Sequence, residues 1–451
     1  MTKDMTMHLD WAALKAHESN AKTYARNIDI ILTRGEGSRL FDQDNRAYLD
    51  CLASAGALPL GHNHPYVMER VQRFLRDGHP LQALDIATPA KIEFMTQLLR
   101  ALPEPFARHA KVQFCGPSGS DAVESALKLF KTATGRRSVL AFHGAYHGQT
   151  MGALSLMGNI KPKQAVSGQM SEVHFLPYPN AYRCPFGVGG TESERLSLAY
   201  IANILEDPES GITKPAAIIL EAVQGEGGCV PASAAWLQGI RALTLQHDIP
   251  LVIDEVMTGL CRTGTRFAHE IGGIVPDAIV LSKAVGGGFP LALLAYQERF
   301  DTWQPGAHAG TFRGNQIAFA AGAATMEYML ENGIEARVQA VGAVLRNGLE
   351  ALQHAHPVIG DVRGRGLMLG VEIIDPDAKP TAYSTAPAAD GQLAHAIKIE
   401  CLKQGLIIEN GGRHSSVLRF LPPLILTEDE AGEIVACFAR ALESVEAHRP
   451  R

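Results

Sequence analysis

The segment IVLSKAVGGGFPLALLAY, residues 279–296, contains two short apolar runs separated by three consecutive glycines and a proline. Each run has the length and composition of a buried β-strand. Four more runs of this kind come earlier, separated by longer stretches with a helical pattern: KVQFCG, SVLAFHG, AAIILEAV and PLVIDEV. Short buried strands that alternate with helices predict a mostly parallel sheet with helices on both faces. The fold class predicted for the middle of the chain is therefore α/β.

The two ends of the chain follow another pattern. Near the start, a polar cluster at residues 42–45 between two apolar runs predicts a β-hairpin. Toward the other end, a long helical segment precedes the apolar run VRGRGLMLGVEII, a further helix, the strand GLIIEN and a last helix with a capping box at Thr427 and Glu430. This mixture predicts a smaller α+β domain. We expect three segments: residues 1–70, which contribute to the small domain, residues 71–332, the large domain, and residues 333–451, the C-terminal small domain.

The bulk composition argues against several classes of protein. The 451 residues are 46% hydrophobic and have a formal net charge of −6, which is typical of a globular protein and gives no reason to expect a nucleic-acid partner. The seven cysteines are scattered and form no C-x-x-C pair, so we expect neither a disulfide framework nor a metal site. No run of about 18 apolar residues occurs, so no membrane span is expected. A cytoplasmic protein fits these features best.

The segment FCGPSGSDAVESALKLF is a candidate phosphate site. An apolar run ends at Cys115, Gly119 loosens the turn, and Ser118 and Asp121 can cap a helix with one apolar face. Backbone N–H groups at such a helix start can bind an anion. The same junction also occurs in α/β proteins without any phosphate, so the motif alone leaves both interpretations open.

A pair of histidines in FHGAYHGQT has a spacing that a metal site on a helix could use. Gly144 and Gly148 argue against a helix here, and no H-E-x-x-H motif accompanies His143 and His147. A turn at a strand end is the better interpretation. Tyr146 in that turn then offers either a flat aromatic surface for a ligand or an ordinary, partly buried side chain.

Two charged residues follow neighbouring apolar runs. PLVIDEV places Asp254 at the end of one predicted strand, and AIVLSKAV places Lys283 at the same end of the next. Sheets of this type bind their ligands at the carboxyl ends of the strands. Alone, Asp254 could be a metal ligand or part of a salt bridge, and a buried lysine must be neutral, paired or covalently used. Together with an aromatic plane and a phosphate-binding helix start, the two residues indicate a pyridoxal 5′-phosphate (PLP) site.

The order of motifs along the chain resembles that of the class III aminotransferases, the ω-amino acid transaminase group of PLP fold type I. The motifs are GSDAVESALKLF, FHGAYHGQTMGALSLMGN, LEAVQGEGG, VIDEVMTGLCRTG, PDAIVLSK, GTFRGNQ and LRFLPPLILTEDE. The resemblance covers essentially the whole chain. It implies a large domain with a mostly parallel sheet of the seven-stranded type and a smaller α+β domain formed by both ends of the chain.

The resemblance implies that four residues contact the cofactor ring. Lys283 would bind the cofactor covalently and later move the proton. Asp254 would pair with the pyridine nitrogen, and Tyr146 and Val256 would lie on the two faces of the ring. The three glycines after Lys283 are then predicted to leave room for the lysine rather than to bind phosphate.

The resemblance also implies a shared site. Gly119 and Ser120 would bind the phosphate, helped by Thr311 of GTFRGNQ from a second subunit. We therefore expect a homodimer in which each subunit completes the active site of the other.

The family's substrate switch has counterparts in this sequence. Glu226 of QGEGG would pair with Arg419 of VLRFLPP while an amine-ended substrate is bound, and would release the arginine for a second carboxylate. At two positions the chain differs from many relatives, because Gln149 replaces an arginine that binds a substrate carboxylate and Met257 replaces a glutamine. We expect another cation to replace that arginine, with Arg313 preferred to Arg413.

Three further segments are similar to one subgroup: LSKAVGGGFPLALLAY, DTWQPGAHAGTFRGNQ and ENGGRHSSVLRFLPPLI. That subgroup moves the terminal amino group of L-2,4-diaminobutyrate to 2-oxoglutarate. The resemblance thus implies an aminotransferase that makes L-aspartate 4-semialdehyde and L-glutamate, or works in reverse. The alternatives are a class III enzyme for another ω-amine, such as 4-aminobutyrate or ornithine, and a PLP-dependent aminomutase.

Overall fold

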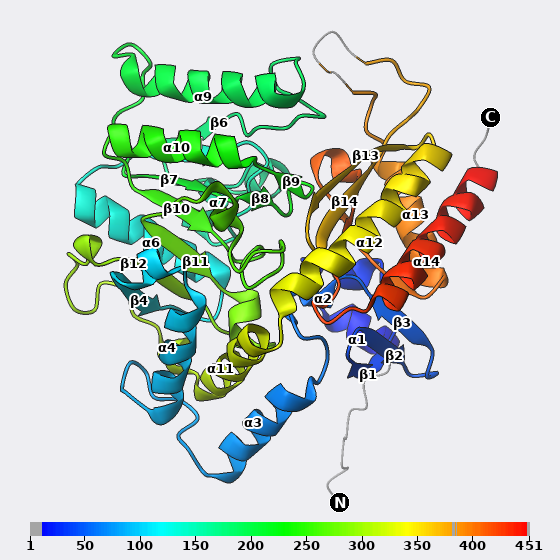
Figure 1. Cartoon of the computed structure of the whole chain (residues 1–451), viewed down its shortest axis with the longest axis horizontal. Helices are drawn as coiled ribbons and strands as arrows, with labels where there is room; N and C mark the ends of the chain where they lie inside the picture. Colours follow the sequence, from blue (N-terminus) through cyan, green and yellow to red (C-terminus); the bar gives the residue numbers. More distant parts are fainter. Residues whose placement is uncertain (1–10, 381–383, 385, 449–451) are drawn as a thin grey trace, which may run out of the picture.

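The chain forms a central sheet of seven strands and two four-stranded sheets built from its ends (Figure 1). This computed structural model describes residues 11–380, 384 and 386–448. Within these residues, no helix has both the length and the apolar character needed to cross a lipid bilayer.

The central sheet has the strand order β4-β12-β11-β10-β7-β5-β6, and all neighbouring strands are parallel except where β12 takes part. Its strands are Ala110–Phe114 (β4), Val139–Phe142 (β5), Val173–Leu176 (β6), Ala217–Leu220 (β7), Leu251–Asp254 (β10), Ala278–Leu281 (β11) and Leu293–Gln297 (β12). Each apolar run that the sequence analysis assigned to the middle of the chain forms one of these strands. The remaining strand, β6, has the sequence VHFL and was not predicted.

Helices cover both faces of the central sheet, as the alternation of strands and helices predicted. Every residue of β5, β7, β10 and β11 is buried. Along β10, Val252 packs with residues of α6 (Gly119–Thr134), whereas Leu251 packs with residues of α9 (Gly190–Glu206) and α10 (Ala234–Gln246). Strands between two helix layers have no solvated face, which explains why their sequences are continuously apolar.

Helix α11 (Gln316–Glu331) packs against α3 (Pro65–Arg76) and α4 (Pro89–Ala101), and the ring of Phe114 on β4 contacts rings of α4 and α11. Their core contains the rings of Phe94 and Phe319, whose centroids are 5.2 Å apart.

Both ends of the chain contribute to the smaller part of the molecule. The first sheet joins β1 (Leu32–Glu36), β2 (Arg39–Asp42) and β3 (Ala47–Asp50) to β15 (Leu406–Ile407). The second joins β13 (Ile359–Arg365), β14 (Met368–Ile373), β17 (Val417–Phe420) and β16 (Glu409–Gly411). The predicted hairpin is the β2–β3 turn, and the capping box of Thr427 and Glu430 begins the last helix, as expected.

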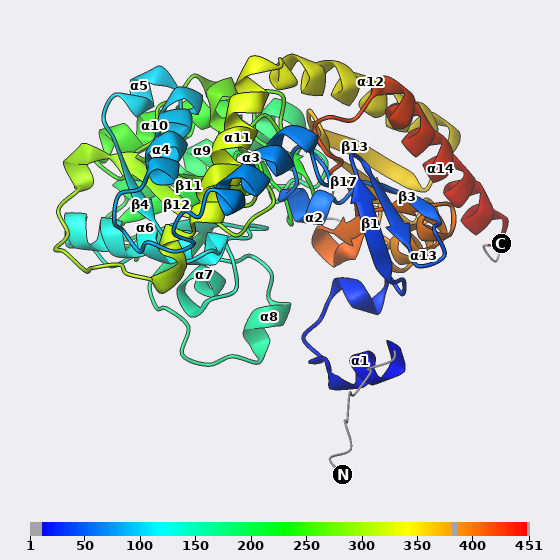
Figure 2. The same ribbon diagram turned by 90° about the horizontal axis from the view of Figure 1, so that it is seen from below.

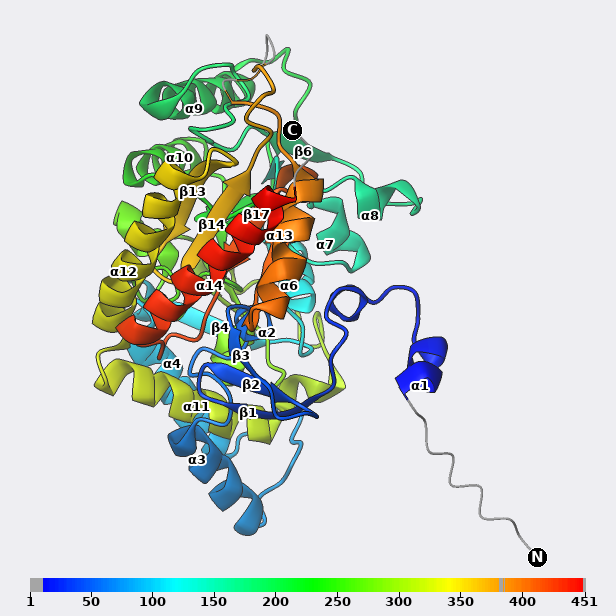
Figure 3. The ribbon, with the colours of Figure 1, turned by 90° about the vertical axis from the view of Figure 1, so that its right-hand side faces the viewer.

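Long helices border the second small sheet in Figure 3: α12 (Ile334–Ala355), α13 (Gly391–Lys403) and α14 (Glu428–Ala447). The shorter elements are α1 (Trp11–His17), α2 (Ala53–Gly56), α5 (Glu104–Ala107), α7 (Met151–Ser155), α8 (Lys161–Gln164), β8 (Val223–Gln224) and β9 (Val230–Pro231). Figure 2 shows α1 at the end of an extended N-terminal segment, away from the main body. The division at residues 70 and 332 stays a prediction, and α3 continues across the first of these positions.

Candidate active site

Four neighbouring strands of the central sheet bring the site together at their carboxyl ends. The order is β5, β7, β10 and β11, and all neighbouring pairs among them are parallel. The turn with Tyr146 follows β5, Glu221 follows β7, Asp254 ends β10, and Lys283 comes two residues after β11. Side chains that are far apart in the sequence therefore share one edge of the sheet.

Asp254 is 4% exposed and accepts two hydrogen bonds. Its Oδ2 bonds with Nδ1 of His147 at 2.8 Å, and its Oδ1 accepts the N–H of Val256 at 3.0 Å. Burial lowers the pKa of His147, but the hydrogen bond and charge of Asp254 outweigh this effect, so the pKa is raised. Nε2 of His147 is buried and has no partner among the described residues. The histidine thus fixes the orientation of the Asp254 carboxylate.

Lys283 begins a short 3-10 helix, Lys283–Gly286, with a positive φ of 50°. Burial lowers the pKa of its amine, and Arg419 lowers it further, while Glu226 and other carboxylates partly offset the decrease. None of the carboxylates in the described ranges forms an ion pair with this amine. A lysine in this state has a larger fraction of neutral amine, which is the nucleophilic form.

The start of α6 lies beside the end of β10. A Cβ added at Gly119 would be 3.1 Å from both methyl carbons of Val256 and 3.6 Å from Cβ of Ser282. Oγ of Ser120 accepts the N–H of Gln149 at 3.2 Å, which joins α6 to the turn that carries Tyr146. The start of α6, where the N–H groups of Ser120 and Asp121 bond to Ser118, therefore lies next to the strand ends with Asp254 and Lys283.

Glu226 and Arg419 form a pair between the large and small parts of the molecule. Nη1 of Arg419 donates to Oε1 of Glu226 at 2.6 Å, and the arginine is 2% exposed. Burial raises the pKa of Glu226, but Arg419 outweighs it and lowers the pKa. The same pair raises the pKa of Arg419 although burial opposes this. Both charges also act on the amine of Lys283, so the pair lies within electrostatic reach of it.

Known proteins are similar to this chain in sequence and in fold. Residues 21–442 match the family described as "Aminotransferase class-III". The chain is 50% identical over 426 residues to the diaminobutyrate–2-oxoglutarate aminotransferase of Rhizobium meliloti (strain 1021), covering 94% of this chain and 90% of that protein. It is 45% identical to the enzyme of the same name from Haemophilus influenzae (strain ATCC 51907 / DSM 11121 / KW20 / Rd), covering 94% and 93%.

The chain belongs to the class-III aminotransferases. A solved structure with a TM-score of 0.83 and 26% identity covers 95% of this chain and 98% of its own. It is an amine transaminase from an uncultivated Pseudomonas species in the PLP-bound form. These findings confirm the predicted family, fold class, enzyme class and cofactor.

The residues of this class-III aminotransferase fit PLP. The space beside Gly119, which a side chain would fill, lies at a helix start that can receive a phosphate. Asp254 is a buried carboxylate held by His147, as a protonated pyridine nitrogen requires, and Lys283 is an amine without an ion-pair partner within the described ranges. The set therefore offers an anion site, a carboxylate and a nucleophilic amine at one sheet edge.

Some predicted site residues lie apart from this group. Nη2 of Arg313 pairs with Asp85 at 2.6 Å, and its Nη1 donates to the main-chain oxygen of His308 at 2.9 Å. Thr311 is exposed at the start of a short 3-10 helix. Arg413 lies near the turn after β5, where its Nη2 would be 3.6 Å from a Cβ at Gly144. Within one chain, Arg313 is therefore held by Asp85 and His308.

Two residues at the site were not singled out from the sequence. Glu221 is 5% exposed, and burial raises its pKa to about 7. Its position directly after an apolar run is the same signal that identified Asp254. Tyr24 lies within electrostatic reach of Glu226 and Arg419, and burial is the main cause that raises its pKa. No local pattern marks Tyr24, because only the path of the N-terminal segment brings it there.

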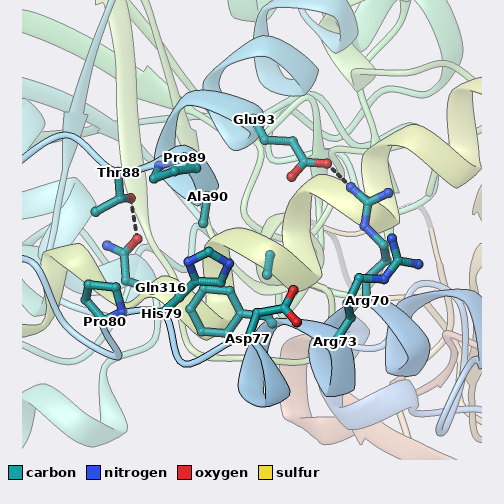
Figure 4. Close-up of a pocket in the computed structure, with 12 residues that line it drawn as sticks. Arg70, Arg73, Asp77, His79, Pro80, Thr88, Pro89, Ala90, Glu93 and Gln316 are labelled. Atoms are coloured by element: carbon teal, nitrogen blue, oxygen red, sulfur yellow. Dashed lines mark hydrogen bonds and ion pairs between the residues drawn. The ribbon is translucent and has the colours of Figure 1, made fainter.

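The site residues named above do not line the pocket in Figure 4. That pocket, of about 250 Å³, lies among α3, α4 and α11. Figure 4 shows the ion pair between Arg70 and Glu93 and the hydrogen bond from Thr88 to Gln316 at its wall. It is therefore a feature of another face of the molecule.

The glycines after Lys283 pack against a helix. Gly287 has a φ of +59°, and a Cβ there would be 2.3 Å from Oγ1 of Thr325 and 2.8 Å from the main-chain oxygen of Ala321, both on α11. Gly287 therefore lets the turn that follows Lys283 lie directly on α11.

This packing predicts a difference between two glycines with the same φ. Gly273 also has a φ of +59°, but a Cβ there would meet nothing within 4 Å. Gly273→Ala should lower the free energy of unfolding by about 1–2 kcal/mol, the cost of the left-handed conformation. Gly287→Ala should add a packing cost of about 1–3 kcal/mol. Urea unfolding of both variants measures the difference, and equal losses would contradict the packing argument.

Proposed function

We propose that this class-III aminotransferase moves the terminal amino group of L-2,4-diaminobutyrate to 2-oxoglutarate, giving L-aspartate 4-semialdehyde and L-glutamate, or catalyses the reverse. The observation that carries the proposal is the pair of Glu226 and Arg419, joined at 2.6 Å within electrostatic reach of Lys283. Two relatives that are 50% and 45% identical over 94% of the chain are named for this reaction and support the choice of substrates.

The proposed roles of the ring-binding residues follow from their positions. When bound, PLP supplies an electron sink that stabilises negative charge on the reacting carbon of the substrate. Lys283 would hold the cofactor and move the proton at that carbon, and Asp254 would hold the ring nitrogen in its protonated form. Tyr146 and Val256 would face the ring from its two sides. Gly119 and Ser120 would bind the phosphate at the start of α6.

The Glu226–Arg419 pair suits an enzyme that accepts two kinds of substrate end. While Glu226 is bound to Arg419, the charge of the arginine is compensated. The active site then accepts a substrate whose reacting end carries only an amine. When 2-oxoglutarate enters, its carboxylate replaces Glu226 on the guanidinium. Nη1 of Arg419 donates to Glu226 while the pair is closed, and the same guanidinium can bind the carboxylate of 2-oxoglutarate, so the exchange needs no new cation.

A second cation is proposed to bind the α-carboxylate of diaminobutyrate, because Gln149 carries no charge. Arg313 is on the loop with Thr311 that we propose reaches the partner subunit, and in its own chain it pairs with Asp85. Arg413 forms no ion pair within the described residues and lies beside the turn with Gly144. Both remain candidates, and within a single chain the position of Arg413 fits better.

Substitution by glutamine distinguishes the two arginines. Loss of the carboxylate ligand should raise the KM for diaminobutyrate about 10- to 100-fold, as expected for a hydrogen-bonded charge pair. The KM for propane-1,3-diamine, which has no carboxylate, should change by less than about twofold. Steady-state kinetics of Arg413→Gln and Arg313→Gln with both amines measures this. If each variant changes the KM for the two amines equally, neither arginine binds the carboxylate of diaminobutyrate.

A half-reaction screen tests the proposed function. The PLP-loaded protein is mixed with single amines without an oxo acid, and the loss of visible absorption is followed. L-2,4-Diaminobutyrate should react faster than 4-aminobutyrate, ornithine and butylamine. Lys283→Ala should show neither turnover nor cofactor that borohydride fixes covalently to the protein, because the nucleophilic amine is gone. A faster reaction with another amine would refute the substrate, and steady isomerisation of one amine without an acceptor would indicate an aminomutase.

We infer that the enzyme is a homodimer with shared sites. Large apolar side chains are exposed on the segments around the pocket of Figure 4, and Thr311 is exposed on a neighbouring loop. These side chains are Leu75, Leu81, Leu84, Ile86, Ile92 and Phe312. An apolar surface of this kind is typical of an interface. A cytoplasmic location is proposed too, because all seven cysteines are free and buried.

Complementation between two variants tests the shared site. Lys283→Ala lacks the reactive amine, and Thr311→Ala should bind PLP weakly because the partner's phosphate site is incomplete. In a mixed dimer, one of the two sites has both Lys283 and Thr311. Random pairing after equal mixing makes about half of the dimers mixed, so about one quarter of all sites should be active. Activity at limiting PLP measures the recovery. If mixing gives no more activity than the separate variants, Thr311 does not act across the dimer.

A further inference from the structure

The carboxylate of Glu221 joins two turns of the active site. Oε1 accepts the N–H of Tyr146 at 3.0 Å, and Oε2 accepts the N–H of Gly225 at 2.9 Å. The first turn carries Tyr146 and His147, and the second carries Glu226. One side chain at the end of β7 therefore holds both the residue proposed to stack on the ring and the residue proposed to switch between substrates.

The two turns also touch through their backbones. A Cβ added at Gly227 would be 2.5 Å from the main-chain oxygen of Gly144, and Nε2 of Gln224 donates to the main-chain oxygen of His143 at 2.9 Å. Such close contact leaves little room for either turn to shift alone. Glu221 supplies the charged hydrogen bonds in this contact, which are stronger than neutral ones.

Glu221 also faces several titratable groups from neighbouring elements. Tyr178 donates to its main-chain oxygen at 2.9 Å, and His147, Asp254, Cys229 and Lys283 are within electrostatic reach. When ionised, the carboxylate favours the protonated form of His147, and it partly offsets the decrease that burial causes in the pKa of Lys283. The carboxylate thus acts on the reacting amine from a distance.

We propose that Glu221 is a positioning residue for transamination: it holds the turn of Tyr146 against the turn of Glu226, and it places a negative charge near Lys283. The inference rests on the proposed function, because it uses the roles proposed for Tyr146, Glu226 and Lys283. Glu221 itself touches neither substrate nor cofactor in this proposal.

Two substitutions separate the two parts of this role. Glu221→Gln keeps the size of the side chain but removes the charge, and its amide can accept only one of the two N–H groups. Glu221→Asp keeps the charge but is one methylene shorter, so it cannot reach both turns. Glu221→Gln should lose both the negative charge and the tether, which is the pair of hydrogen bonds that joins the two turns. Glu221→Asp should lose mainly this tether.

Two measurements without any amino donor distinguish these effects. Titration of the cofactor-free protein with PLP, followed by tryptophan fluorescence, should show binding weakened by about 10- to 100-fold in both variants, because a buried charged hydrogen bond is lost. The pH at which the visible absorption of the PLP-loaded protein changes reports the nitrogen of Lys283. This pH should move lower in Glu221→Gln, because a nearby negative charge is gone, and should stay near the wild-type value in Glu221→Asp.

Glu124→Gln is the matched control. Glu124 is also a carboxylate that holds a turn, because its Oε1 accepts the N–H of Gly152 at 2.8 Å, the N–H of Ala153 at 3.1 Å and the hydroxyl of Thr150 at 2.6 Å. Loss of these bonds should lower the unfolding temperature without moving the absorption transition. A general effect of removing a carboxylate that holds a turn is thereby separated from the effect of Glu221.

The proposal is refuted if Glu221→Gln binds PLP as tightly as the wild-type protein does. It is also refuted if the visible absorption of Glu221→Gln changes at the same pH as that of Glu124→Gln. Should Glu221→Gln not fold, PLP binding to Glu221→Asp decides: weaker binding supports the tether, and wild-type binding overturns it. The identity of the amino donor does not enter these results. A wrong substrate would appear only in the half-reaction screen, so the two failures are distinguishable.

Discussion

The parallel pairing of β10 with β11 is the interaction on which the site depends. Asp254 pairs in register with Val280, and both strands are fully buried between helices. A charged side chain inside such a strand would lose its hydration without compensation, so the chain can place charges only where the strands end. Asp254 and Lys283 therefore meet at one edge, and the neighbouring strands add Glu221 and the turn with Tyr146 to the same edge.

Charge compensation then determines what each group at this edge can do. Asp254 pairs with His147 at 2.8 Å, and Arg419 pairs with Glu226 at 2.6 Å. Lys283 is surrounded by these charges without an ion pair of its own among the described residues. Burial without a partner disfavours the ammonium form, and a neutral amine is what a covalent reaction with a carbonyl requires. The partners of the other charges thus leave Lys283 as the group that reacts.

The small part of the molecule completes the site through one strand. Arg419 on β17 lies opposite Gly370 of β14 and Glu409 of β16, and its side chain extends to Glu226 in the large part. A Cβ at Gly370 would be 3.0 Å from Cβ of Cys229, so the two parts are in close contact at this strand. Movement of the small part would therefore act directly on the cation that we propose selects between substrates.

The strand ends with Asp254 and Lys283 could be predicted from the sequence, because burial and strand length leave a local pattern of apolar residues. The hairpin, the cap of the last helix and the family motifs could also be predicted, because each depends on residues close together in the sequence. The sequence did not show that Glu221 holds Tyr146, 75 residues away, or that Arg313 pairs with Asp85 in its own chain. Such contacts depend on the order of strands in the sheet and on the paths of the loops. Periodicity reports whether a residue is buried, whereas only the tertiary structure decides which buried charges meet.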